Sequence, residues 1–155
     1  MKFSQAPSSV LMVRPASFGY NPQTSGTNAF QTDQTDSNTN VTKKALDEFN
    51  VMVDTLIFND VDVIVVDDSA EPRKPDAVFP NNWISFHEDG TVILYPMMAE
   101  NRRLERAIPA IDTLKSKFQI NQVIDLSGFE KQNQFLEGTG SVVFDYPNKI
   151  AYASR

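Results

Sequence analysis

A repeat with an offset of 58 residues is the feature that most constrains the fold of this chain. The offset places Leu46 on Leu104, and the triplet Asp-Thr-Leu at 54–56 on the same triplet at 112–114. It also superposes the expected elements, helix on helix, strand on strand and hairpin on hairpin. Each unit is therefore expected to contain a hairpin, a helix and a strand, and such units bury their apolar faces only against neighbouring units.

Two helices are expected, one in each unit. Residues 41–58 carry apolar side chains at helical spacing, and Thr42 could cap the start of this helix. Residues 101–118 form the second expected helix. Pro109 lies inside it, so a kink or a break is predicted there.

Strands are expected where short apolar, β-branched runs lie between turn signals. Residues 63–66 form a continuous apolar run of the kind found in strands that are buried on both faces. Asp-Gly predicts a hairpin at 83–95, and Asp-Tyr-Pro-Asn predicts a second hairpin at 141–153. Further strands are predicted at 10–14 and 123–126.

A polar segment at about 15–40 separates the first strand from the first helix. Asn, Gln, Thr, Ser and Gly dominate it, and it has no apolar period. A segment of this length without secondary structure is usually functional or disordered. Phe18, Tyr20 and Phe30 could pack against the domain, so we expect order in the first part and mobility after Gln31.

The composition excludes several classes of function. Apolar residues make up 41% of the chain, which indicates one globular domain over residues 1–155. The net charge of −6 argues against nucleic acid or an anionic membrane as partner. Neither a membrane span nor a signal peptide is evident, so a cytoplasmic location is expected. With no cysteine and one histidine, His87, the chain cannot hold a Cys-His pair or a thiolate metal site, and no cofactor is expected.

Two loops at equivalent positions of the two units carry the candidate functional residues. Asp76, Asn81 and Asn82 lie before the first hairpin, and Glu137 lies in a glycine-rich loop before the second. Glycines permit tight backbone geometry and the close approach of a ligand. Polar groups on the same edge of successive units would build a central site in a radially repeated fold. Equally, the asparagines could be turn residues and Glu137 a solvated acid.

These segments resemble those of the arginine deiminase and amidinotransferase superfamily. Residues 75–83, PDAVFPNNW, resemble the P-D-x-V-F-x-E-D segment of dimethylarginine dimethylaminohydrolases. Residues 137–141, EGTGS, resemble their [DE]-G-G-D segment. Residues 94–105, LYPMMAENRRLE, are similar to a segment in which R-P is followed by R-R-x-E. Residues 21–31, NPQTSGTNAFQ, resemble the substrate loop of the citrulline-utilising branch.

The resemblance implies a pentein fold, a five-bladed α/β propeller of ββαβ units, and this matches the repeat unit above. Five units of this period need about 290 residues, so the chain is expected to hold about half of the propeller. The cysteine nucleophile and the catalytic histidine of the family would then lie outside the chain. An open propeller would also expose strand edges, through which two chains could associate.

The resemblance further implies roles for individual residues. Asp76 and Asn82 fall where guanidinium-binding carboxylates lie, with Asn81 between them, and Asn21 falls in the substrate loop. Glu137 matches the acid that orients or charges the catalytic histidine. The expected function is the substrate-binding part of a cysteine-dependent C–N hydrolase or amidinotransferase for an arginine-like guanidino or ureido compound, inactive by itself. The alternative is a pentein-like binding module without enzymatic activity.

The chain departs from the family pattern at three positions. Asn82 replaces an aspartate and offers no charge to a guanidinium, which favours a neutral ureido or modified guanidine over arginine. Tyr95 replaces an arginine for the substrate carboxylate, and Gly140 replaces the last aspartate of G-G-D. Two other features are expected to be structural, namely His87 as a turn or surface residue and residues 102–106 as a solvated helix face. The alternative for residues 102–106 is a contact to a neighbouring blade.

Overall fold

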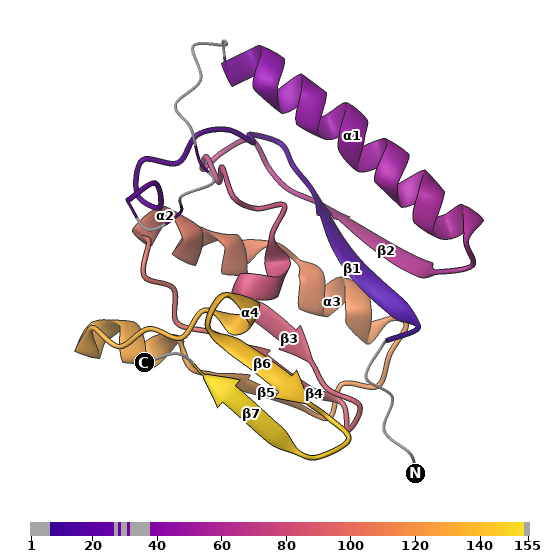
Figure 1. The fold of residues 1–155 in the computed structure, drawn as a ribbon, viewed down its shortest axis with the longest axis vertical. Coiled ribbons are helices and arrows are strands. Elements are labelled where there is room, and N and C mark those ends of the chain that lie inside the picture. Colours follow the sequence, from indigo (N-terminus) through magenta and orange to yellow (C-terminus); the bar gives the residue numbers. More distant parts are fainter. Residues whose placement is uncertain (1–6, 27, 29–30, 32–37, 154–155) are drawn as a thin grey trace.

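Three small β-sheets and the helices that connect their strands make up the fold (Figure 1). The structure is a computed structural model that describes residues 7–26, 28, 31 and 38–153. In chain order its elements are β1 (Ser9–Arg14), α1 (Asn38–Phe58), β2 (Asp62–Asp67), η1 (Pro80–Asn82), β3 (Ile84–Phe86), β4 (Thr91–Leu94), α2 (Glu100–Arg103), η2 (Leu104–Ala107), α3 (Ala110–Lys115), β5 (Gln122–Asp125), η3 (Ser127–Gln132), α4 (Gly138–Ser141), β6 (Val142–Asp145) and β7 (Ile150–Ala153).

The strand pairing follows the predicted repeat. The first unit pairs β1 with β2 in parallel across α1, and the second pairs β4 with β5 in parallel across α2, η2 and α3. The antiparallel hairpins β3–β4 and β6–β7 begin at Ile84 and Val142, which are 58 positions apart. Both predicted hairpins are therefore present, as are the predicted strands at the start of the chain and after the second helix.

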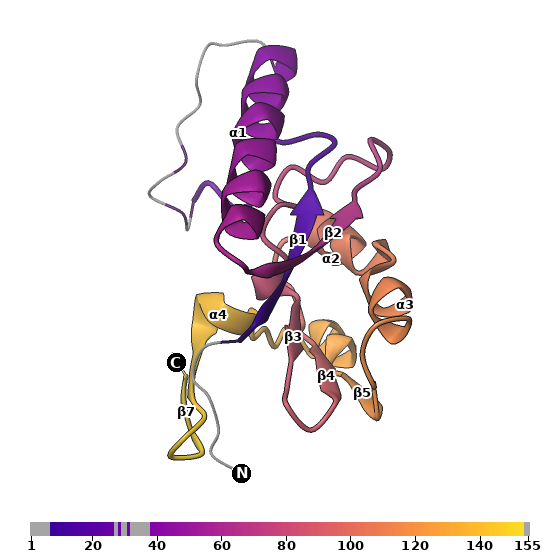
Figure 2. The same cartoon turned by 90° about the vertical axis from the view of Figure 1, so that its right-hand side faces the viewer.

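The main core lies between the β1–β2 pair, the β3–β4 hairpin and the helices of the second unit. Its buried members are Val13, Val66, Ala77, Trp83, Ile84, Val92, Met97, Ile108 and Ala110. Helix α1 lies along the β1–β2 pair on the side away from α2 and α3 (Figure 2). Strand β2 was predicted to be buried on both faces, but only Ile64 and Val66 are buried, whereas Val63 and Val65 are half-buried.

The first helix begins at a different residue from the one predicted, whereas the second is interrupted where a break was expected. Helix α1 begins at Asn38, so the prediction of Thr42 as its cap is wrong. Thr42 lies inside the helix, and its hydroxyl donates to the carbonyl of Phe18 at 2.8 Å. The second helix is broken before Pro109, as predicted, because Ile108 has the extended backbone that a following proline favours. None of the described helices is long and apolar enough to cross a membrane.

The polar segment after β1 is ordered where it meets the rest of the chain. The ring of Phe18 packs edge-on against that of Phe79, with 6.4 Å between their centroids. A turn at Asn21–Ser25 is closed by backbone hydrogen bonds to the carbonyl of Asn21. This agrees with the expected order of its first part. Phe30 and the residues at 32–37 lie outside the described residues, so mobility there stays a prediction.

Two strands at sheet edges expose apolar side chains. Strand β5 ends its sheet with Val123 and Ile124 exposed, and β7 exposes Ile150 and Tyr152. Unpaired edges of this kind can pair with another strand. Association of two chains through them stays a prediction.

Two methionines provide a matched test of where the core lies. Met97 is fully buried in the core, whereas Met52 on α1 is 56% exposed. Met97→Ala should lower the free energy of unfolding by about 2–5 kcal/mol, because it leaves a cavity. Met52→Ala should change it by less than about 0.5 kcal/mol. Urea unfolding of both variants measures the difference, and equal losses would contradict this placement of the core.

Candidate functional site

The loop before β3 and the glycine turn at α4 meet in the structure. The Asn81 side chain donates a hydrogen bond to the Thr139 hydroxyl. Gly138 has a positive φ of 29°, and a Cβ atom there would lie 2.2 Å from the carbonyl oxygen of Asn81. Only glycine fits so close an approach. The two loops predicted from the repeat to share one edge therefore lie in direct contact.

Asp76 is buried and joins its loop to the polar segment. Its Oδ2 accepts hydrogen bonds from Asn21 Nδ2 at 2.6 Å and from the Thr24 hydroxyl at 3.2 Å. Asn21 is fully buried, and its Oδ1 accepts a hydrogen bond from Asn101 Nδ2 at 2.7 Å. Two predicted site residues, Asn21 and Asp76, are thus brought together, with Asn21 bonded directly to the Asp76 carboxylate.

Arg102 lies at the centre of a buried polar cluster. Its Nε and Nη2 donate to the two carboxylate oxygens of Glu105, both at 2.9 Å. Its Nη1 donates to Asn82 Oδ1 at 3.0 Å, and its Nη2 also donates to the Phe79 carbonyl at 3.2 Å. The Oδ2 of Asp76 lies 3.9 Å from Nε. One guanidinium therefore contacts the loop that carries Asn82 and lies beside the loop that carries Asp76.

The prediction of a solvated helix face at 102–106 is wrong. Arg102 is only 5% exposed and Glu105 is fully buried. These two residues are spaced i, i+3, so they lie on one side of the helix and can pair. The sequence shows that spacing, but it does not show that a loop covers this side of the helix.

Burial is the largest influence on the pKa of Glu105. It raises the pKa of Glu105 to about 7, and the charges of Asp76 and Asp68 act in the same direction. The hydrogen bonds and the charge of Arg102 oppose this shift. A second buried ion pair, Lys74–Asp68, has its nitrogen and oxygen 3.0 Å apart. The region behind the site is therefore rich in buried acids, each close to a cation.

Glu137 is half-buried at the edge of this cluster. Its Oε1 accepts a hydrogen bond from the backbone N–H of Met98 at 2.9 Å, and its own N–H donates to the Ser141 hydroxyl at 3.3 Å. Its negative charge favours the charged form of the Arg102 guanidinium. Glu137 is thus held in one orientation beside Asn82 and the glycine turn. Among the described residues, no three acidic or histidine side chains converge where they could hold a metal ion.

His87 lies at the turn of the first hairpin, as predicted, but it is not a free surface residue. Its Nε2 lies 3.0 Å from the Ser85 hydroxyl, and its ring packs edge-on against Phe144 of the next hairpin. Burial lowers the pKa of His87. The Ser85 hydroxyl lies 2.8 Å from that of Tyr95, which is buried in the hairpin. These contacts join the two hairpins to each other.

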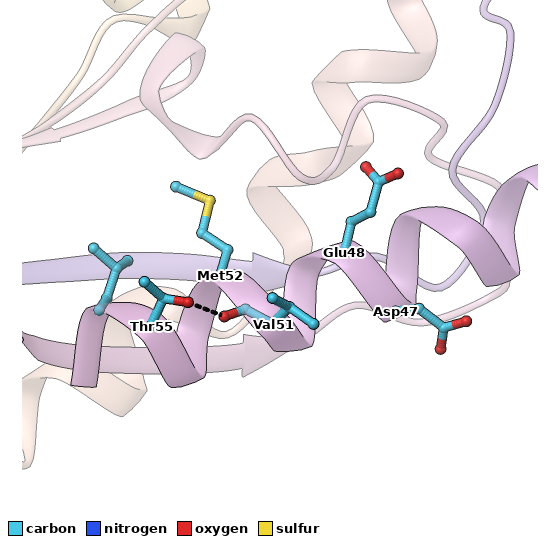
Figure 3. Close-up of a pocket in the computed structure, with 6 residues that line it drawn as sticks. Asp47, Glu48, Val51, Met52 and Thr55 are labelled. Atoms are coloured by element: carbon cyan, nitrogen blue, oxygen red, sulfur yellow. Dashed lines mark hydrogen bonds between the residues drawn. The ribbon is translucent and has the colours of Figure 1, made fainter. Parts of the chain in front are cut away.

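Two surface pockets lie away from the predicted site residues in the two loops. One is an apolar hollow of about 560 Å³ on the outer face of α1, where Asp47, Val51, Met52 and Thr55 line it (Figure 3). The other, of about 730 Å³, has His87 in its lining. Neither includes Asp76, Asn81, Asn82 or Glu137. The candidate site is therefore defined by its converging polar groups.

The pKa of Glu105 predicts how stability depends on pH. The folded-state value of about 7 lies above the ordinary value of 4.5, so the folded state binds this proton more tightly than the unfolded state. The resulting stability is complete below about pH 4.5 and is lost as the pH rises through about 7. Relative to Glu105→Gln, the wild-type free energy of unfolding should fall by roughly 3 kcal/mol over this window. Urea unfolding at several pH values measures this, and parallel curves would contradict it.

The chain is similar to one protein family and to several solved structures. Residues 14–155 match the family of eukaryotic N,N dimethylarginine dimethylhydrolases. The N-terminal domain of ArgZ, a cyanobacterial arginine dihydrolase, was solved with a covalently bound reaction intermediate, and it matches with a TM-score of 0.62 and 19% identity. That match covers 94% of this chain and 47% of the other. No curated protein sequence matches the chain.

Two further solved structures share the fold. A dimethylarginine dimethylaminohydrolase variant, solved as an adduct with S-methyl-L-thiocitrulline, has a TM-score of 0.60 and 19% identity over 89% of this chain and 47% of its own. An AgrE variant in complex with L-arginine has a TM-score of 0.61 and 17% identity over 94% of this chain and 19% of its own. The predicted partial pentein fold is confirmed, and the chain spans about half the length of the first of these relatives.

Proposed function

Since this chain belongs to the eukaryotic N,N dimethylarginine dimethylhydrolase family, we propose that it forms the substrate-binding part of a cysteine-dependent enzyme. That enzyme would act on a C–N bond of a guanidino or ureido group, as a hydrolase or an amidinotransferase. The chain contains no cysteine, so the nucleophile must come from outside it. The observation that carries the proposal is the contact of the Asn81–Asn82 loop with the Glu137–Gly138 turn.

The geometry divides the site residues into two groups. Asn81 is exposed and Asn82 and Glu137 are half-buried, so these three can meet a ligand directly. Asp76 is buried, and its Oδ2 already accepts hydrogen bonds from the Asn21 amide and the Thr24 hydroxyl. In the proposal, Asp76 and Asn21 therefore support the wall of the site, and Asp76 contributes its negative charge at short range.

Glu137 is suited to orient a histidine. Its side chain is held in place because Oε1 accepts a hydrogen bond from the backbone N–H of Met98. A carboxylate fixed in this way can accept a hydrogen bond from an imidazole N–H and stabilise the charged ring. The acid–base histidine would be supplied together with the cysteine, because His87 is committed to the hairpin contacts.

Arginine-like compounds are the substrate class that this proposal favours. L-Arginine is bound by the AgrE variant and S-methyl-L-thiocitrulline by the dimethylarginine dimethylaminohydrolase variant. The acids around the candidate site would attract a cationic group, whereas the amide of Asn82 is neutral. Guanidino and ureido groups share the planar shape and the array of hydrogen-bonding atoms that such a site could hold.

Two measurements on the purified chain test this function. We expect no release of ammonia, citrulline or ornithine from L-arginine, dimethylarginine or L-citrulline, since the nucleophile is absent. Turnover that survives a metal chelator would contradict the assignment of catalysis to groups outside the chain.

Binding is tested by NMR on the ¹⁵N-labelled chain. Millimolar L-arginine or L-citrulline should shift the amide resonances of Asn81, Asn82, Gly138 and Gly140. L-Norleucine, which lacks the guanidino or ureido group, is the control and should leave them in place. Shifts that are absent, or confined to other parts of the chain, would overturn the proposed site and favour a binding module with a different ligand.

A further inference from the structure

Only one orientation of the Asn82 amide allows a hydrogen bond with Arg102. A guanidinium has five N–H donors and no acceptor. The Nη1 of Arg102 lies 3.0 Å from Oδ1 of Asn82. The reversed amide would place N–H groups against N–H groups, so the chemistry of Arg102 fixes which end of the Asn82 amide faces it. The carbonyl of Asn82 is turned inward.

The other end of the amide faces the glycine turn. A Cβ atom built on Gly140 would lie 3.0 Å from Asn82 Nδ2. The NH₂ group therefore lies against the backbone of Gly140, where the absence of a side chain leaves it room. Within the part of the chain that the structure describes, no group accepts a hydrogen bond from this NH₂. It is a donor available on the side of the site where Glu137 lies.

Arg102 cannot easily turn away from this contact. Both oxygens of Glu105 hold it in a bidentate pair at 2.9 Å, and the Phe79 carbonyl holds it at 3.2 Å. Arg102 is 5% exposed and Glu105 fully buried, so water does not compete for these contacts. A bidentate arginine–carboxylate pair fixes the plane of the guanidinium as well as its position.

We propose that Arg102, held by Glu105, is a positioning residue that sets the hydrogen-bonding polarity of Asn82, so that this side chain offers a ligand a donor and not an acceptor. The ligand atom beside Asn82 is then an acceptor, such as the carbonyl oxygen of a ureido group. A guanidinium N–H at the same place would meet another N–H. An aspartate at position 82 would instead give one oxygen to Arg102 and the other to the ligand, which reverses the preference.

The orientation is tested first in the free chain, independently of any ligand. The wild-type chain should show nuclear Overhauser effects between the side-chain NH₂ of Asn82 and the α-protons of Gly140. In the double variant Arg102→Met, Glu105→Leu, the amide is free to turn, and these effects should weaken by about half as two orientations become populated. Both charges are removed together because one left alone would be buried and unpaired. Wild-type chain without these effects would overturn the proposal.

Selectivity is tested next, at pH 8, where Glu105 is ionised. The wild-type chain should bind L-citrulline about tenfold more tightly than L-arginine, the effect of one mismatched hydrogen bond. Asn82→Asp should favour L-arginine, and the double variant should bring the two affinities within about threefold. Asn50→Asp adds the same charge on the exposed face of α1 and should retain the wild-type ratio. An Asn82→Asp chain with the wild-type ratio would contradict the proposal.

The two proposals can fail separately. The selectivity part rests on the proposed function, whereas the nuclear Overhauser effects do not. Binding of neither compound would overturn the proposed function and the ligand preference, while the free-chain contact would still decide the role of Arg102. If the double variant does not fold, Asn82→Asp and the wild-type contact decide the question.

Discussion

The buried pair of Arg102 and Glu105 is the interaction on which the candidate site depends. Removing two charges from water is costly, and their attraction offsets the cost only when the geometry is good and the remaining hydrogen bonds are satisfied. Here both carboxylate oxygens are used, and Arg102 also binds Asn82 and the Phe79 carbonyl. The pair therefore does more than hold a helix in place, because the loop that carries Asn82 is built around it.

The repeat explains why the Arg102–Glu105 pair lies beside the candidate site. Each unit places a loop before its hairpin, and the loops of successive units meet where Asn81 contacts Thr139 and Gly138. The helix of the second unit supplies Arg102, which donates a hydrogen bond to the Phe79 carbonyl in the first of these loops. A chain that repeats hairpin, helix and strand thus places the more exposed amides of Asn81 and Asn82 in front of the buried charges of Arg102 and Glu105.

The sequence predicted the architecture better than the site. The offset of 58 residues and the turn signals located both hairpins, because strand pairing and turn chemistry are local properties. The break at Pro109 followed from the missing N–H of proline. The burial of Arg102 and Glu105 could not be derived in this way, since it depends on a loop about 20 residues away that covers one side of the helix. For the same reason, nothing in the sequence showed that Asn21 would cover Asp76.

A double-mutant cycle on Arg102 and Glu105, measured by urea unfolding at pH 8, tests the central claim most directly. If the pair organises this part of the fold, Arg102→Met and Glu105→Leu should each cost about 3–5 kcal/mol, because each leaves a buried charge without its partner. The double variant should cost several kcal/mol less than the two losses together. Additive losses would show that the two side chains act independently and that the pair does not organise this part of the fold.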